Sequence, residues 1–203
     1  MAAARDLDDD ALARRAARLV ADGDLPDIGA ALRRLDAAPR LEGLARRHLA
    51  AMMESMLGQD GVAALRLARL EDALAVMETI EDLEERLADD RWIHRGVVLA
   101  GRVATGVFDP EAVVHLRQHG DRPLEDLEPE LGLLEAVEIV HRSSRSRFGV
   151  LSSLEFEIDG GRFRLRRCPP DQVPLDAADL FDGGPVATIG VPGLRRLIER
   201  SRP

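Results

Sequence analysis

Residues 154–166 read Leu-Glu-Phe-Glu-Ile-Asp-Gly-Gly-Arg-Phe-Arg-Leu-Arg, and apolar and charged side chains alternate on both sides of Asp159-Gly160. A period of two is typical of a β-strand with one buried face, and Asp-Gly is a preferred pair for a two-residue type I′ turn. The stretch therefore predicts a β-hairpin whose register joins apolar to apolar and acid to base. The expected facing pairs are Leu154 with Leu165, Phe156 with Phe163, Glu155 with Arg164, and Glu157 with Arg162.

Upstream of this hairpin, the apolar residues recur at helical spacing as far as about residue 141. Caps, prolines and glycines divide this part into candidate helices. A third helix is expected to close at Gly58, and Asp109-Pro110-Glu111 has the residues of a strong helix start. The expected helices begin near Asp9, near Pro26, at Leu41, at Asp60, at Trp92, at Asp109 and at Pro129.

Downstream of the hairpin, a short strand is expected near residues 186–189, and Pro192 can start a final helix. The predicted fold class is α+β. Residues 1–145 are expected to form a predominantly helical domain. Residues 146–203 are expected to form a small β-rich module that contains the hairpin and a C-terminal helix.

Three residue types are missing, because the 203 residues contain no lysine, no asparagine and no tyrosine. All three have A/T-rich codons, so the absence indicates a GC-rich, bacterial genome. It also excludes a Walker phosphate loop, a protein kinase site and Schiff-base catalysis, each of which needs a lysine. A catalyst would have to use His, Asp, Glu, Ser, Cys or Arg. A protein without catalytic activity is the preferred expectation over an enzyme, and no cofactor is expected.

The rest of the composition indicates a cytoplasmic protein. The single cysteine, Cys168, forms no internal disulfide and is interpreted as a small apolar core residue. Nowhere do eighteen apolar residues run together, so no membrane segment is expected. An apolar content of 45% is enough for a hydrophobic core.

Charge is distributed unevenly along the chain. The formal net charge is −9, yet residues 142–167 hold seven arginines against three acids. Guanidinium groups form charge-assisted hydrogen bonds with phosphates and carboxylates. This basic segment is therefore the strongest candidate binding site. Three of its arginines are expected on a loop and three on one strand face. The candidate binding residues are Arg142, Arg145, Arg147, Arg162, Arg164 and Arg166.

Two kinds of partner fit the basic segment. An acidic protein surface, including the acidic body of a second copy, is the preferred interpretation. A nucleic-acid-binding regulator is the alternative, in which the hairpin is the wing of a winged helix and a helix over about 130–141 reads the duplex. Glu130, Glu135 and Glu138 on that helix would repel phosphates, which disfavours this alternative.

A metal site is the third hypothesis. His115 and His119 would share one face of a helix, and Glu111 would lie one turn earlier, so three potential ligands would line up. No more distant ligand can be identified. The preferred function is a non-catalytic adaptor or assembly subunit that works by protein–protein interaction in a bacterial cytoplasmic complex. A nucleic-acid-binding regulator and a metal-dependent enzyme are the alternatives.

Overall fold

A computed structural model of the chain describes residues 2–25, 27–87, 92–109, 112–175 and 178–202, with side chains from residue 9 onward. The chain forms two compact units, Met1–Leu65 and Arg66–Pro203. This division differs from the predicted one at residue 145, which falls inside a β-strand. The α+β class is confirmed.

The first unit is helical. It contains α1 (Ala2–Ala21), α2 (Ile28–Arg34), a 3-10 turn η1 (Pro39–Leu41) and the first part of α3 (Glu42–Arg86). Asp27 caps α2, because its carboxylate accepts a hydrogen bond of 2.7 Å from the N–H of Ala30. The small core of this unit is built from alanines and longer aliphatic residues: Ala13, Ala16, Ala17, Val20, Ile28, Ala31, Leu32, Leu41, Ala45 and Leu49.

The predicted helix break at Gly58 is confirmed. Gly58 has φ 73° and ψ 169°, which is a left-handed conformation that interrupts α3. The helix continues beyond it, and the residues predicted to make an apolar stripe there are buried at Val76, Ile80 and Leu83. Leu87, assigned to the same stripe, is 45% exposed at the end of the helix.

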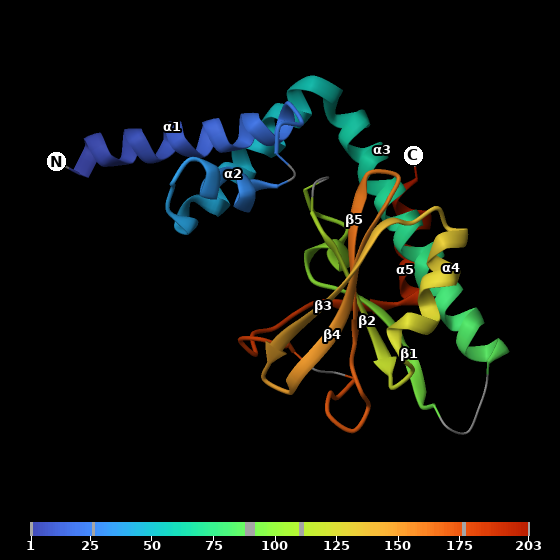
Figure 1. The fold of residues 1–203 in the computed structure, drawn as a ribbon. Helices are drawn as coiled ribbons and strands as arrows, with labels where there is room; N and C mark the ends of the chain where they lie inside the picture. The colour runs from blue at the N-terminus through green and yellow to red at the C-terminus, as the bar shows by residue number, and fades with distance from the viewer. Residues whose placement is uncertain (1, 26, 88–91, 110–111, 176–177, 203) are drawn as a thin grey trace. The chain divides into compact units, whose positions relative to one another are not determined.

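The second unit is built on one mixed sheet (Figure 1). In the described residues its strands are β1 (His94–Ala100), β2 (Val114–Gly120), β3 (Val137–Ser146), β4 (Gly149–Ile158), β5 (Gly161–Arg167) and β6 (Thr188–Gly190). Their spatial order is β3-β4-β5-β2-β1-β6. All neighbours are antiparallel except β2 and β5, which are parallel.

The hairpin has the predicted register. Phe156 lies opposite Phe163 and Glu155 opposite Arg164, and the other two predicted pairs are also present. Asp159 and Gly160 have φ values of 47° and 70°, as a type I′ turn requires. The two phenylalanine rings stack with centroids 5.4 Å apart. Local sequence therefore determined this element.

The predicted helices from Trp92 to about His141 are wrong. Strands β1 and β2 lie in this segment, and the last expected helix is reduced to η3 (Leu124–Leu127) and α4 (Glu128–Leu133) before strand β3 begins. The physical reason is tertiary: β2 pairs with β5, some fifty residues later, and that pairing overrides a local helix preference. The predicted cap at Asp109-Pro110-Glu111 lies partly outside the described residues.

The winged-helix alternative is contradicted for the same reason. The helix assigned to base reading is a strand from Val137 onward, and Glu135 has φ 59°, which ends the helical path. The hairpin does not protrude as a wing, because β5 lies in the interior of the sheet between β4 and β2.

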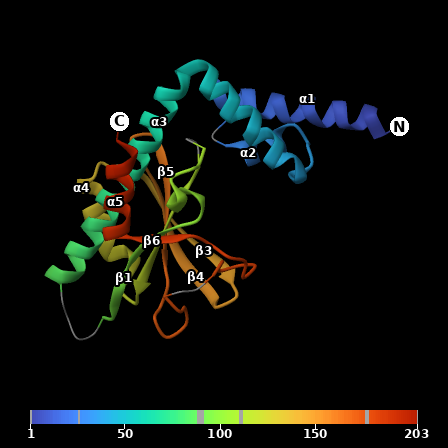
Figure 2. The ribbon, with the colours of Figure 1, turned by 180° about the vertical axis from the view of Figure 1, so that it is seen from behind.

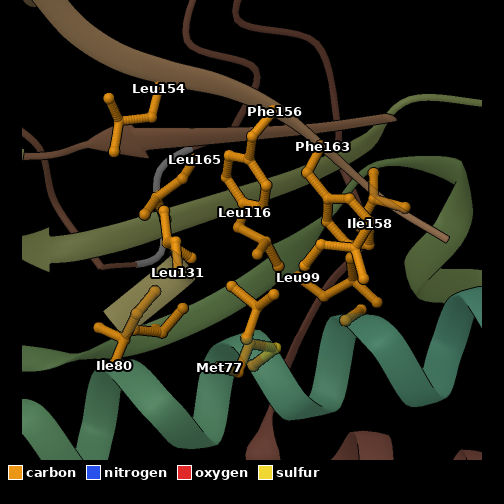
Figure 3. Packing of buried hydrophobic residues seen from close by; sticks show 14 of the residues in the cluster. Met77, Ile80, Leu99, Leu116, Leu131, Leu154, Phe156, Ile158, Phe163 and Leu165 are labelled. Atoms are coloured by element: carbon orange, nitrogen blue, oxygen red, sulfur yellow. The ribbon is translucent and has the colours of Figure 1, made fainter. Parts of the chain in front are cut away.

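One face of the sheet packs on helices. Figures 1 and 2 place α3, α4 and α5 (Val191–Ser201) on the same side of the strands. In Figure 3, Leu99, Leu116 and Leu165 from the strands point at Met77 and Ile80 of α3. Alternate residues of each strand supply this core, so the intervening residues face away from the helices.

A buried ion pair fixes β2 to α3. The Nε of Arg122 lies 2.9 Å from a carboxylate oxygen of Glu84, and the amide of Gln118 donates to the other oxygen at 2.8 Å. Both charged side chains are about 95% shielded from solvent. None of the helices in the described ranges combines the length with the apolar composition that a bilayer span requires.

Candidate functional site

Arginines and a histidine gather on the sheet face that points away from α3. The parallel register of β2 and β5 sets His115 beside Arg164 and Arg117 beside Arg166. Because residues alternate along a strand, all four lie on the face opposite Leu116. Like charges on neighbouring strands are destabilising unless something compensates them.

A cavity of about 260 Å³ opens between these strands and the loop that follows β5. Strand residues supply its positive side, and the loop supplies Asp179 and an aromatic ring. The lining residues are Ala100, Gly101, His115, Leu116, Arg117, Arg164, Arg166, Asp179, Leu180, Phe181 and Val186. The cavity thus contains three guanidinium groups and one carboxylate.

Arg166 is the most isolated charge of the cavity. Its residue is 8% exposed, and within the described residues its Nε has no hydrogen-bond partner. One terminal nitrogen makes a long hydrogen bond of 3.5 Å to the hydroxyl of Ser144, and the guanidinium lies 4.7 Å from the ring centroid of Phe181. Burial, and then the charge of Arg164, lower the pKa of this guanidinium.

Arg117 and Arg164 are held differently. Arg117 is 5% exposed and donates to the carbonyl of Ala178 at 3.1 Å, and burial lowers its pKa. Arg164 is paired with Glu155, with its Nε at 2.9 Å and a terminal nitrogen at 2.7 Å from one carboxylate oxygen. Arg164 therefore lines the cavity as one member of an ion pair whose other member, Glu155, lies outside the lining.

Asp179 is fixed as an anion at the rim. Its carboxylate accepts hydrogen bonds from the N–H groups of Phe181 at 2.7 Å and Asp182 at 3.1 Å. Burial alone would raise its pKa, but these N–H groups and the nearby arginines lower the pKa below the ordinary value. The rigid turn therefore holds both Asp179 and the ring of Phe181 at the cavity.

His115 is neutral at physiological pH. Burial is the main cause that lowers its pKa to about 4, and the charges of Arg164, Arg166 and Arg117 act in the same direction. A neutral imidazole has one N–H donor and one acceptor. His115 can therefore bind a ligand by hydrogen bonding without adding charge to the cavity.

The structure brings only two of the six predicted binding residues, Arg164 and Arg166, into this cavity. Arg162 lies on the same strand face but outside the lining. Arg142 and Arg145 were predicted to lie on a loop, but they lie on strand β3. Their spacing of three residues is odd, so their side chains point to opposite faces of the sheet. Arg147 lies in the turn after β3, and its N–H donates to the carbonyl of Leu180 at 2.9 Å.

The helical metal site is not formed. His115 and His119 lie on strand β2, where four residues span roughly 13 Å, so the two rings cannot share one ion as they would on a helix. Glu111 lies outside the described residues. In the part of the chain that the structure describes, no group of three or more His, Cys, Asp or Glu side chains is placed to hold a metal.

Cys168 is a core residue. It is fully buried in a small apolar cluster with Leu151, Val173 and Leu180, and burial raises its thiol pKa to about 11. A thiol with so high a pKa is a poor nucleophile. This cluster packs the loop onto the arginine face beside the cavity.

Arg117, Asp179 and Phe181 were missed by sequence reasoning. A signal for Arg117 existed, because Val114-His-Leu-Arg117 alternates apolar and polar residues as the hairpin does, although Gln118 breaks the pattern. Asp179 and Phe181 lie on an irregular loop whose path follows no sequence period. Only the fold shows that this loop returns to β2 and β5.

Comparison with known proteins finds no match: no family profile, no curated protein and no solved structure is similar to this chain. Functional inference therefore rests on the chemistry of the molecule's own surfaces.

Proposed function

We propose that this protein is a non-catalytic adaptor or assembly subunit that binds an acidic, extended segment of a partner protein along the open edge of β3. The observation that supports it is a ten-residue edge strand that carries arginines and is exposed over most of its length. Edge strands present unpaired backbone N–H and C=O groups, and partner segments add to such edges as further strands.

The edge is suited to this mode of binding. Glu138 has φ 54° and the register of β3 shifts between Val137 and Val140, so a bulge blunts the first part of the strand. From Val140 to Ser146 the pairing with β4 is regular. The opposite edge, β6, is three residues long and offers far less backbone.

Charge indicates which partner the edge accepts. No acid occurs from Ile139 to Leu154, whereas Arg142, Arg145 and Arg147 are all exposed. Two copies of β3 would bring these arginines together, which disfavours self-association through this edge. Exposed valines, Val140 at 39% and Val150 at 68%, add apolar contact. An acidic strand with some apolar residues is the complementary partner.

Photo-crosslinking tests the proposal. The variant Ser143→p-benzoylphenylalanine places a crosslinker on β3, and Glu199→p-benzoylphenylalanine on the exposed side of α5 is the matched control. After irradiation in lysate from a GC-rich bacterium, we expect one protein to be crosslinked through residue 143 and not through residue 199. Mass spectrometry should locate the crosslink in a stretch rich in Asp and Glu.

Charge reversal completes this test. The double substitution Arg142→Glu and Arg145→Glu, added to the Ser143→p-benzoylphenylalanine variant, should abolish the crosslink. The melting temperature checks that this variant is folded. Nucleic acid crosslinked at residue 143 and removed by nuclease would overturn the proposal in favour of the regulator. A second copy of the chain as the crosslinked species, or a crosslink that survives charge reversal, would also overturn it.

A further inference from the structure

The open edge of β3 presents the backbone groups of alternate residues. Ser146 and Gly149 are paired across a two-residue turn, so they form a hydrogen-bonded pair. Hydrogen-bonded and non-hydrogen-bonded pairs alternate along an antiparallel ladder. His141, Ser143 and Arg145 therefore direct their N–H and C=O groups away from β4, towards the open edge. The two-residue turn between β4 and β5 gives the same alternation.

A row of side chains crosses the sheet from this edge to Arg167. Ser143 of β3 lies opposite Ser152 of β4. Ser153 lies opposite Arg166 of β5, so the same register sets Ser152 beside Arg167. Alternate residues of a strand share a face, and this row is in step with the leucines that pack on α3. Its side chains therefore point to the helix-covered side of the sheet.

A pocket of about 310 Å³ lies over this row. Ser143, Ser152 and Arg167 line it, and Leu124 and Glu125 of η3 line it from the helix-covered side. Serine side chains are short and end in a hydroxyl that can donate one hydrogen bond. The two serines thus leave space between the open edge and the guanidinium, and they add donors along the way.

Arg167 provides a positive charge that the described residues do not pair. Its guanidinium donates to the carbonyl of Asp121 at 3.4 Å, which uses one of five N–H groups, and it takes part in no ion pair within the described ranges. Arg142 also lines the pocket, but a carboxylate lies 3.7 Å from its Nε. Glu125, the acid of the lining, is 69% exposed and lies 3.9 Å from Nδ1 of His141, so solvent screens its repulsion of a second acid.

We propose that a glutamate of the partner segment, placed opposite Ser143, enters this pocket and pairs with Arg167. The inference rests on the proposed function, because the partner must first add to β3 as a strand. Strands lie about 4.8 Å apart, so the partner strand lies roughly 14 Å from β5. Glutamate and arginine are long side chains that can meet over the two serines in a charge-assisted hydrogen bond, whereas aspartate is one methylene shorter.

Fluorescence anisotropy with the full-length chain tests the glutamate. The probes are the labelled peptide Thr-Val-Thr-Glu-Thr-Val-Thr and the same peptide with Gln or Asp at the centre, at one ionic strength. We expect the Glu peptide to bind roughly tenfold more tightly than the Gln peptide, and more tightly than the Asp peptide. Binding of the Gln or the Asp peptide that equals binding of the Glu peptide would overturn this inference but not the edge-strand proposal. No binding of any peptide would overturn both.

Two variants locate the contact. Arg167→Met keeps an unbranched side chain and removes the guanidinium. Arg145→Met is the matched control, because it removes an arginine from the same face of β3 outside the pocket. We expect the preference for Glu over Gln to vanish in Arg167→Met and to persist in Arg145→Met. Any other pattern would contradict the assignment, since the glutamate would then respond to the general charge of the edge.

A third variant does not depend on the folding of Arg167→Met. Ser152→Val keeps the arginine and places a branched side chain, which strands tolerate well, in the middle of the row. It should abolish the preference for Glu while the Gln peptide still binds, and its melting temperature checks that it is folded. A preference for Glu that survives in Ser152→Val would overturn the proposed path to Arg167.

Discussion

The two faces of strands β2 and β5 differ in how their burial affects the stability of the fold. Leu116 and Leu165 face α3, are at most 1% exposed and join the main core. Their sequence neighbours Arg117 and Arg166 are nearly as buried, at 5% and 8%, but on the opposite face. Burial of a leucine stabilises the fold by about 2 kcal/mol, whereas burial of a guanidinium costs free energy. Burial on the helix-covered face therefore stabilises the fold, whereas burial of the arginines on the opposite face lowers the free energy of unfolding.

The largest effect is expected on the helix-covered face. Leu165→Ala removes a fully buried side chain and leaves a cavity, so the free energy of unfolding should fall by about 3 kcal/mol. Urea unfolding measures this change. Val150→Ala, at an exposed apolar position, is the control and should change it by less than about 0.5 kcal/mol. Equal losses of stability in the two variants would contradict the assignment of Leu165 to the stabilising core.

Lowering the pH should reduce the free energy of unfolding through His115 on the arginine face. The folded pKa of His115, about 4, lies below its unfolded value of 6.5, so the unfolded chain binds the proton first as the pH falls. Stability is complete above pH 6.5 and declines towards pH 4, by up to ~3 kcal/mol from this residue. Burial lowers the pKa of His119 in the same sense. Urea titrations from pH 7 to pH 4 should give a shallower decline for His115→Gln than for wild type; an identical slope would contradict this.

A smaller effect of opposite sign is expected at the residue next to Leu165. Arg166→Met should raise the free energy of unfolding by about 1 kcal/mol, because it removes a buried charge that has no ion-pair partner within hydrogen-bond distance among the described residues while keeping an apolar contact with Phe181. The melting temperature measures it. A clear decrease would mean that Arg166 stabilises the fold, and the contrast between the two faces would fail.

Local sequence was sufficient where neighbouring residues in space are also close in sequence. The β4–β5 hairpin was predicted with its register, because Asp159-Gly160 and the alternation on both sides specify it within thirteen residues. The break at Gly58 and the final helix α5, which begins near Pro192, were predicted for the same reason. Each needs only a turn, a cap or a proline.

The segment from Trp92 to His141 was misassigned, and for strand β2 the reason is a distant partner. A helix and a strand are both open to Val114-His-Leu-Arg-Gln-His119 until β5 is beside it, and that neighbour follows about fifty residues later. The candidate site was likewise predicted only in part. Arg164 and Arg166 were identified from their clustering, but Arg117 belongs to the misassigned strand and Asp179 to an irregular loop.

The sequence by itself determined the α+β class, the hairpin and its register, the exclusion of lysine-dependent chemistry and the concentration of arginine between residues 142 and 167. Tertiary structure alone decided which arginines act together. The parallel pairing of β2 with β5 joins Arg117 to Arg166, while the pleat separates Arg142 from Arg145. Charge density is a property of composition, but a binding site requires convergence in space, and long-range strand pairing is what produces it.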